Sequence, residues 1–516
     1  MSEHGPALTA APPPAVAPEH PRDTDTDSST LAAFGYRQQL HRRMGRYASF
    51  AAGFSFISVL TTVFQFFAFG YSFGGPAFFW TWPVVFAGQL AVAACFAELA
   101  ARYPISGAIY QWSTRLSGAA FGWFAGWLMV LGQIVVVSAA ALALQVVLPP
   151  LWSGFQLTGG DPSPLSPTGA ANAAVLGVVL LAVTTVVNVL DIRIMAVVSS
   201  IGVTAELVGV ALMAVLLLTH GDRGPGVVMH TGSAGSGGLG LLLVASFSAA
   251  YVMVGFDSAG EMSEETRNPR RTAPRTILTA LSAAGAAGGL LLLGGLVAAP
   301  SLTDGRLASE GLSYVLTSRF GGSLGRVLLA DVALAVCVAT LAIQTAGARM
   351  VFSMARDGAL PRSRRLAAVS ARSGMPTAPA VVVGVLAAAA LLLNLASPEA
   401  YLALGTTCIV LVYLAYAMVT GPMLLRRLRG GWDTAAQGSD EHGRPLFTLG
   451  RWGLPVNALA LLFGLVMAVN LAWPRAEVYD PQGGHWYLQW FTVLVLAGAL
   501  LLGAVAHAAV RRRPRP

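Results

Sequence analysis

The feature that most constrains the fold is a series of twelve mostly apolar runs, each about 20 residues or longer. They cover residues 49–71, 77–101, 118–148, 170–190, 194–219, 239–263, 274–299, 325–350, 377–396, 400–425, 454–473 and 486–509. A helix needs about 20 apolar residues to cross the ~30 Å hydrocarbon core of a bilayer. Only 11% of the residues are charged, against about 25% in soluble domains. The sequence therefore predicts an all-α integral membrane protein with twelve transmembrane helices.

The arginines indicate the orientation. The chain has no lysine, and all 32 basic residues are arginines. Counting the runs from an N-terminus inside the cell places 27 of the 32 on the cytoplasmic side. Because cytoplasmic loops are enriched in basic residues, we expect a multi-pass protein of the cytoplasmic membrane with both termini in the cytoplasm. The arginines lie mostly at span ends, so the net charge of +8 does not indicate nucleic-acid binding.

The chain outside the runs suggests one membrane domain with two tails. Residues 1–45 are rich in Pro, Ala and Asp and are predicted to form a disordered cytoplasmic tail, 46–510 form the transmembrane domain, and 511–516 form an Arg-rich cytoplasmic tail. No metal site or disulfide framework is expected, because single cysteines lie in separate apolar runs, at Cys95, Cys337 and Cys408. There is no HExxH, no GxSxG on a strand-to-helix turn and no phosphate-loop motif, so we expect no enzyme and no cofactor.

Two of the runs contain residues that disturb a helix. The first half of run one is crowded with small and hydroxyl residues, and run six carries Gly255, Asp257, Ser258 and Gly260 near mid-membrane. Interrupted segments at corresponding places in two halves of a chain indicate the central site of a transporter. A helix contact made by small residues is the alternative for run one. A carboxylate at the depth of Asp257 is costly in lipid and is usually functional.

Four segments resemble the amino acid–polyamine–organocation permeases. They are "GFSFISVLTT" (53–62), "FAELAARYPISGAIYQWSTRL" (96–116), "GFDSAGEMSEETRNPRRTAPRTI" (255–277) and "ARMVFSMARDGALP" (348–361). The chain is most similar to the amino acid/choline transporter branch, which includes gamma-aminobutyrate and choline permeases. The resemblance covers residues 45–510. It implies the leucine-transporter fold, in which spans 1–5 and 6–10 form an inverted repeat with discontinuous helices 1 and 6, here with two extra helices.

The resemblance also implies a substrate site at the two interruptions. Backbone amides near Ser58 would hold a substrate carboxylate at a half-helix N-terminus, although this family often has a Gly-rich sequence where this chain reads Ile-Ser-Val. Tyr251 takes the position of a gating aromatic, with a packed aromatic as the alternative. Asp257 is expected to line the pathway as an ammonium partner or a protonatable switch. The candidate substrate-binding residues are Ser55, Ile57, Ser58, Val59, Gln133, Tyr251, Gly255, Phe256 and Asp257.

Other polar residues are candidates for gating and for ion coupling. The gating candidates lie at the cytoplasmic ends of spans two and eight and could equally be structural ion pairs: Glu98, Arg102, Arg349, Arg356 and Asp357. Glu261, Glu264 and Glu265 are expected at a solvated, ion-paired inner end of span six. The ion-coupling candidates are Thr340, Thr345, Glu206 and Asp331. Proton symport, sodium symport and exchange all remain open.

The expected function is transport of a small amino acid or related zwitterion by alternating access, coupled to H⁺ or Na⁺. The first alternative is a transporter of cationic amines such as choline, ethanolamine or polyamines, and the second is a membrane sensor that moves nothing. The expected partners are the small-molecule substrate and the lipid bilayer, and the protein is expected to be a monomer or a homodimer.

Overall fold

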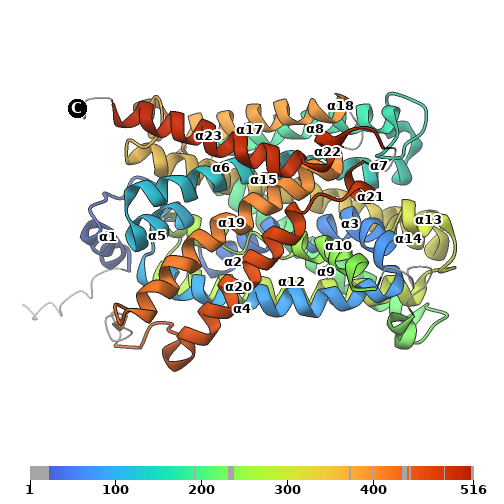
Figure 1. Cartoon of the computed structure of the whole chain (residues 1–516), viewed down its shortest axis with the longest axis horizontal. Helices are drawn as coiled ribbons and strands as arrows, with labels where there is room; N and C mark the ends of the chain where they lie inside the picture. Colours follow the sequence, from blue (N-terminus) through green and yellow to red (C-terminus); the bar gives the residue numbers. More distant parts are fainter. Residues whose placement is uncertain are drawn as a thin grey trace, which may run out of the picture.

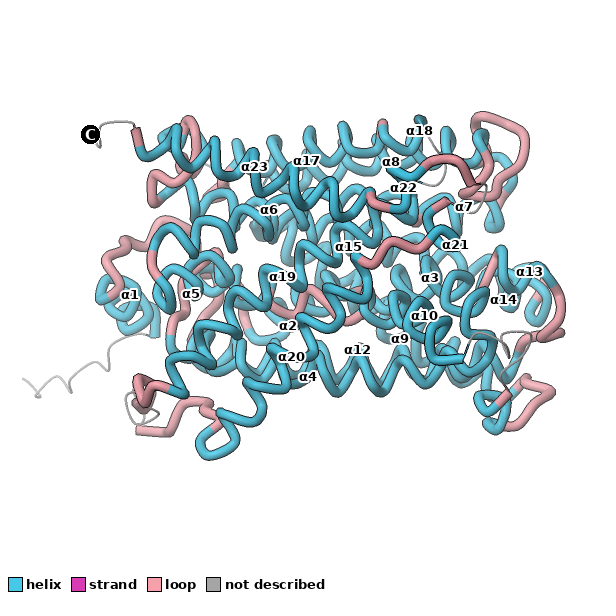
Figure 2. The backbone as a smooth tube through the Cα atoms, in the orientation of Figure 1, coloured by secondary structure: helices cyan, strands magenta, loops and turns pink. Residues whose placement is uncertain are grey.

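The fold is a bundle of helices. The computed structural model describes residues 23–190, 192–230, 238–370, 373–396, 400–432, 438–440, 443–480 and 483–512. Within these ranges the regular structure is helical, and the only β-type pairings are two isolated bridges. Most helices run along the long axis of the molecule and the loops gather at its two ends (Figures 1 and 2). The predicted all-α class is confirmed.

In the part of the chain that the structure describes, thirteen long helices build the bundle. They are α2 (Arg46–Ile57), α3 (Val59–Gly74), α4 (Thr81–Arg102), α6 (Ala119–Leu142), α8 (Pro167–Leu190), α9 (Ile192–Thr219), α10 (Gly238–Val252), α12 (Pro269–Ala298), α15 (Gly322–Arg356), α17 (Thr377–Leu391), α19 (Ala400–Leu428), α20 (Gly453–Ala472) and α23 (Phe491–Arg511).

Shorter helices connect or extend these. They are α1 (Asp23–Ala33), η1 (Gly75–Trp80), α5 (Ala108–Ser117), α7 (Leu144–Leu151), η2 (Ser153–Phe155), η3 (Pro225–Met229), α11 (Ser258–Glu261), η5 (Ser263–Glu265), α13 (Gly305–Ser309), α14 (Leu312–Phe320), α16 (Ser363–Leu366), α18 (Leu393–Ala396), η7 (Gly450–Trp452), α21 (Ala476–Tyr479) and α22 (Trp486–Gln489).

Ten segments of the described chain are long and apolar enough to cross a membrane. The first, Arg46–Arg102, has 57 residues and contains predicted runs one and two. Run six corresponds to α10, which is apolar but has only 15 residues. The ten segments and α10 together account for all twelve predicted runs, whereas the number of membrane crossings stays a prediction.

The outer surface of the bundle is apolar, which is what contact with lipid requires. Val183 on α8, Ile201 on α9, Leu462 on α20 and Leu501 on α23 are 56–69% exposed. Rows of exposed aliphatic side chains of this kind are rare on water-soluble monomers. Helices suit this environment because they satisfy their own backbone hydrogen bonds where no water is available.

The two ends of the bundle differ. Figure 1 shows α1 and the C-terminal end of α23 at one end, and α13 and α14 at the opposite end. We call the first the arginine-rich end, because it also carries Arg270, Arg349, Arg356 and Arg427 at or near helix ends. The arrangement agrees with termini on one side of the membrane, but which side this is stays a prediction.

Residues 23–45 belong to the predicted disordered tail, but the structure shows a helix there and contacts with the bundle. Residues 23–33 form α1, and the following segment lies across the arginine-rich end. The Tyr36 hydroxyl donates to the carboxylate of Asp357 at 2.9 Å. The Met44 amide donates to the Glu265 carbonyl at 2.9 Å, and the Arg267 amide donates to the Met44 carbonyl at 3.0 Å.

The partners Asp357, Glu265 and Arg267 lie more than 200 residues further along the chain, so the local composition of this segment does not reveal these contacts. Residues 1–22, and 513–516 of the predicted C-terminal tail, lie outside the described residues.

Candidate functional site

Run one is interrupted at Ser58. α2 ends at Ile57 and α3 begins at Val59, and Ser58 between them has φ 38° and ψ 91°. A positive φ is unfavourable for a residue that has a Cβ, so the interruption needs support. That support comes from α9, because both the Ser58 hydroxyl and the Leu60 amide donate to one oxygen of Glu206, at 2.9 and 3.1 Å. The Glu206 carboxylate therefore caps the N-terminus of α3.

Glu206 has no cationic partner among the described residues. Its side chain is 1% exposed, and its second carboxylate oxygen accepts no hydrogen bond there. Asp331 on α15 interacts with it electrostatically. A Cβ added to Gly209, three residues after Glu206 on α9, would lie 1.7 Å from Asp331 Oδ2. The small residue thus lets the second carboxylate approach α9 close to Glu206.

The other two coupling candidates, Thr340 and Thr345, also lie on α15. Thr340 donates to the Val336 carbonyl at 2.8 Å, and Thr345 is hydrogen-bonded to the Asn188 side chain at 2.6 Å. Both hydroxyls are therefore engaged within the helix bundle.

Run six is interrupted between α10 and α11, at residues 253–257. Gly255 has φ 96°, and a Cβ there would lie 1.8 Å from a ring carbon of Phe56. The Gly255 amide donates to the hydroxyl of Tyr416 on α19 at 3.2 Å, and that hydroxyl donates to the carboxylate of Asp257. The second interruption is thus held by α19 and packs directly on the end of α2.

A small buried cavity lies where the two interruptions meet. It measures about 10 Å³, roughly the room that one water molecule needs. Its polar lining groups are hydroxyls and one amide, and the rest of the wall is apolar. The lining residues are Phe56, Ile57, Thr61, Thr62, Gln65, Val136, Ala140, Tyr251, Val254, Ala339 and Ile343.

The structure brings only some of the predicted substrate residues to this cavity. Ile57 and Tyr251 line it, and Ser58, Val59 and Gly255 form the interruptions beside it. The others, Ser55, Gln133, Phe256 and Asp257, are buried but are not part of its wall.

Two of the buried residues have other contacts. Gln133 Nε2 donates to the carboxylate of Glu261 at 2.7 Å. The Phe256 ring packs on those of Phe96 and Tyr416, with centroids 5.9 and 5.4 Å away.

Sequence reasoning missed most of the cavity wall. Thr61 and Thr62 were visible as polar residues in an apolar run, but Gln65 lies deeper in the same helix. Val136 and Ala140 on α6 and Ala339 and Ile343 on α15 look like any other apolar residues of a span. Nothing in their local sequence marks them, because their role comes from the tertiary packing of the bundle.

Buried ion pairs close the arginine-rich end. Arg349 donates to Glu265 at 2.9 Å with both side chains 0% exposed, and Arg356 pairs with Glu264 at 2.8 Å. The amide of Ser106 also donates to Glu264, at 3.1 Å. The expectation of a solvated end was therefore wrong: Glu264 and Glu265 are paired with α15 away from water, and Glu261 is buried against Gln133. Pairing is what makes burial of such charges tolerable.

Asp357 closes this end together with the N-terminal segment. It accepts hydrogen bonds from Tyr36, Tyr110 and Gln111, at 2.9–3.1 Å. Burial and the Asp357 carboxylate raise the pKa of Tyr36, so its phenol remains a donor. The Arg356 guanidinium lies 4.1 Å from the centre of the Tyr36 ring.

Glu98 and Arg102 do not pair with each other. Glu98 forms an ion pair with Arg427 and also accepts hydrogen bonds from Trp432 and Thr448, at 3.2 and 3.0 Å. The Arg102 guanidinium lies 4.6 Å from the centre of the Trp432 ring. The end of α19 and the segment after it thus provide partners that spacing along α4 could not suggest.

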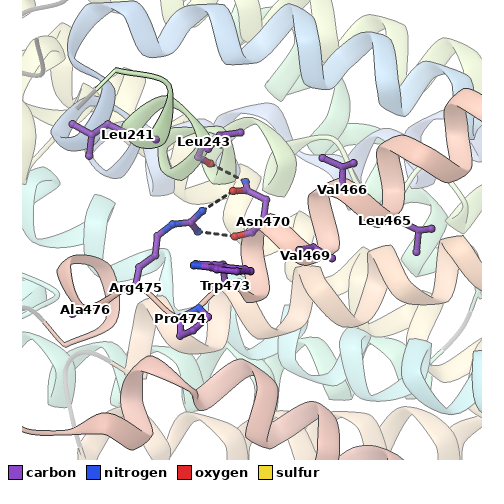
Figure 3. Close-up of a pocket in the computed structure, with 11 residues that line it drawn as sticks. Leu241, Leu243, Leu465, Val466, Val469, Asn470, Trp473, Pro474, Arg475 and Ala476 are labelled. Atoms are coloured by element: carbon purple, nitrogen blue, oxygen red, sulfur yellow. Dashed lines mark hydrogen bonds between the residues drawn. The ribbon is translucent and has the colours of Figure 1, made fainter. Parts of the chain in front are cut away.

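A larger pocket, of about 880 Å³, lies on the outer surface between α10 and α20 (Figure 3). Arg475 donates to the backbone and side-chain oxygens of Asn470 at 2.6 and 2.8 Å, and Asn470 donates to the Leu243 carbonyl at 2.9 Å. The remaining wall is mainly aliphatic, and the pocket reaches neither helix interruption. It is therefore separate from the candidate site.

Known proteins resemble this chain over most of its length. The amino acid permease family model matches residues 48–497. Amino-acid permease BAT1 of Arabidopsis thaliana is 27% identical over 480 residues, which cover 88% of this chain and 89% of the relative. Branched-chain amino acid permease BcaP of Lactococcus lactis is 28% identical over 374 residues, covering 69% and 76%. Thiamine transporter thi9 of Schizosaccharomyces pombe is 24% identical over 531 residues, covering 94% and 85%.

The matched region contains both helix interruptions, the cavity between them and the ion pairs Arg349–Glu265 and Arg356–Glu264. The chain therefore belongs to the amino acid permease family, and it is a multi-pass membrane transporter and not an enzyme.

Proposed function

We propose that the protein moves a small neutral amino acid across the cytoplasmic membrane by alternating access, in a twelve-span leucine-transporter fold with both termini in the cytoplasm. The observation that carries this proposal is the meeting of two interrupted helices, from runs one and six, around one buried cavity. Runs one and six are equivalent in a five-plus-five repeat, and such interruptions supply free backbone groups at mid-membrane.

The chemistry of the cavity favours a zwitterion. The N-terminus of α3, which Glu206 caps here, carries a partial positive charge that would suit a substrate carboxylate once Glu206 releases it. The C-terminus of α10 carries a partial negative charge that suits an ammonium group. Val136, Ala140, Ala339 and Ile343 would receive a small apolar side chain. Substrate entry must widen the space, because one water volume does not hold an amino acid.

The names of two relatives bear on which substrate class is favoured. BcaP is a branched-chain amino acid permease, which agrees with an apolar wall. The relative thi9 is a transporter of thiamine, a cation, so it keeps cationic amines as the second candidate. Since no carboxylate side chain lines the cavity, and Asp257 is hydrogen-bonded to Tyr416, we favour the neutral substrate.

We propose proton coupling through Glu206, with Asp331 as its neighbour. The Glu206 carboxylate holds the Ser58 hydroxyl and the Leu60 amide at the interruption, and it has no cation to balance its charge among the described residues. A proton on Glu206 would weaken its hold on α3. Binding of H⁺ and the shape of the substrate site would then be coupled.

Uptake into proteoliposomes tests the substrate proposal. Radiolabelled alanine, leucine, gamma-aminobutyrate and choline are compared in the wild type and in Ala140→Phe, which fills the cavity. We expect concentrative uptake of a neutral amino acid and a loss of at least about tenfold in the variant, equivalent to about 1.4 kcal/mol. Val505→Phe, on the exposed face of α23, is the control and should transport normally. Uptake of choline alone would show that the substrate is a cationic amine. Binding of an amino acid without flux would show that the protein is a sensor.

The coupling proposal is tested with Glu206→Gln. Imposed proton and sodium gradients are varied separately, and exchange of internal for external substrate is measured in parallel. We expect the variant to lose accumulation driven by a proton gradient while it keeps exchange, because Gln still accepts a hydrogen bond. A variant that responds to the proton gradient like the wild type would place coupling elsewhere.

A further inference from the structure

A second pocket, of about 600 Å³, lies at the arginine-rich end, apart from the substrate cavity. Its walls come from α2, the first turns of α12, the residue Asp27 near the N-terminus and the segment after α19. We call it the arginine pocket after its cationic lining residues, Arg46, Arg270, Arg271, Arg275 and Arg444.

The anionic residues of the pocket do not balance its arginines. Of its two aspartates, Asp440 pairs with Arg271 at 2.5 Å and with Arg444 at 3.0 Å. Asp27 interacts at 3.6 Å with Arg42, which does not line the pocket. After these ion pairs form, the pocket therefore keeps a net positive charge.

Arg46 and Arg275 carry this excess charge. Both side chains are exposed, and neither has an ion-pair or hydrogen-bond partner for its guanidinium among the described residues. Arg275 also follows Arg271 by four residues on α12, where like charges repel. The N-terminal end of α12 adds its own partial positive charge. Arg46 and Arg275 thus give the pocket the charge to bind an anion.

The surroundings of the pocket favour a lipid over a soluble anion. Tyr47 and Phe50 of α2 line the same pocket, and Tyr47 is 50% exposed. The Tyr47 hydroxyl is hydrogen-bonded to Thr204 of α9, whose neighbours Val197 and Ile201 are 56% and 63% exposed on the apolar outer surface. Tyrosine at such a border is typical of the membrane–water interface. The pocket therefore adjoins both polar solvent and the lipid-facing surface.

We propose that the arginine pocket binds the phosphate headgroup of an anionic phospholipid from the cytoplasmic leaflet. Arg46 and Arg275 hold the phosphate, and the acyl chains lie along the apolar face of α2 and α9. Basic pockets between transmembrane helices on the cytoplasmic side suit such headgroups. The leaflet rests on the proposed orientation, while binding itself does not depend on transport. The headgroup links α2, the inner half of broken run one, to α12.

The test is a binding titration of the full chain in neutral detergent. The probes are dioctanoyl phosphatidylglycerol, dioctanoyl phosphatidylcholine and glycerol 3-phosphate, and the variant is Arg46→Gln/Arg275→Gln. We expect phosphatidylglycerol to bind the wild type at least about tenfold more tightly than the variant, because each basic residue near a membrane surface adds to this attraction. The double variant Arg364→Gln/Arg365→Gln, with two exposed arginines at the same end on α16, is the matched control and should bind like the wild type.

Three results would overturn the proposal. They are equal binding of phosphatidylglycerol by the Arg46/Arg275 variant, equal binding of phosphatidylcholine by the wild type, and binding of glycerol 3-phosphate as tight as that of the lipid, which would make the site one for soluble phosphates. The variant Arg46→Lys/Arg275→Lys keeps both positive charges, so it shows whether weaker binding comes from the loss of charge or from a damaged fold. It should keep most of the binding, and all variants should unfold at a similar temperature.

Discussion

At the scale of single residues, Gly255 is one of the tightest points of the candidate site. Its backbone has a positive φ, and the Phe56 ring occupies the place of a missing side chain. Both conditions require glycine. The contact joins the two interruptions, so any residue that enlarges this position separates them.

Gly255→Ala is therefore expected to abolish uptake and to destabilise the protein by about 1–3 kcal/mol, the usual cost of overpacking. Uptake and the unfolding temperature in detergent are the measurements. Gly498→Ala on α23 is the control, since a Cβ there meets nothing within 4 Å. Adding Phe56→Ala should relieve the clash but not the positive φ. A fully active Gly255→Ala protein would show that the two interruptions do not need this contact.

The residue scale also shows where sequence reasoning ends. Asp257 and Tyr251 stood out because a polar or aromatic residue in an interrupted span is conspicuous. Glu206 stood out as a carboxylate in a span, yet nothing in α9 indicated that it caps α3. The aliphatic wall of the cavity gave no signal at all. Chemistry is visible in a sequence, but partners that meet only through tertiary packing are not.

At the scale of elements, the interruption between α2 and α3 has an unusual residue at its centre. Ser58 takes a positive φ without being glycine, and its hydroxyl is hydrogen-bonded to Glu206 and Thr61, at 2.9 and 2.7 Å. Strain of this kind persists only where the surroundings impose it. The irregularity of both runs could be predicted from their residues, whereas the support from α9 and α19 could not.

Comparing Ser58→Gly with Ser58→Ala isolates this strain, because both variants lack the hydroxyl. We expect the glycine variant to be more stable than the alanine variant by about 1 kcal/mol. At Ser138, inside regular α6, the order should be reversed, since glycine weakens a helix interior by about 0.5–1 kcal/mol. Unfolding temperatures of the four proteins decide the question. The same order at both sites would mean that the interruption is not strained.

At the scale of the whole molecule, closure of the arginine-rich end depends on charges buried without water. Arg349 and Glu265 are both fully buried and join α15 to the segment that follows α11. Removing one partner leaves the other charge alone, which costs about 3–5 kcal/mol. Replacing both partners removes that penalty.

Arg349→Met is thus expected to destabilise the protein strongly, and Arg349→Met/Glu265→Leu is expected to recover most of the loss. The unfolding temperature measures this coupling. Exposed Arg306, paired with Asp304 at 2.8 Å, is the control, because its replacement should have little effect. If the double variant were as unstable as the single one, Arg349 and Glu265 would have to stabilise the protein through contacts other than their ion pair.

The backbone bridge between Met44 and the segment Glu265–Arg267 makes movement at the arginine-rich end measurable by hydrogen exchange. Two amide hydrogens, on Met44 and Arg267, fasten the chain before α2 to the chain before α12. Opening of the arginine-rich end by separation of these segments must break both bonds together. The two amides should then be protected from deuterium exchange by the same factor, and that factor reports how rarely the two segments separate.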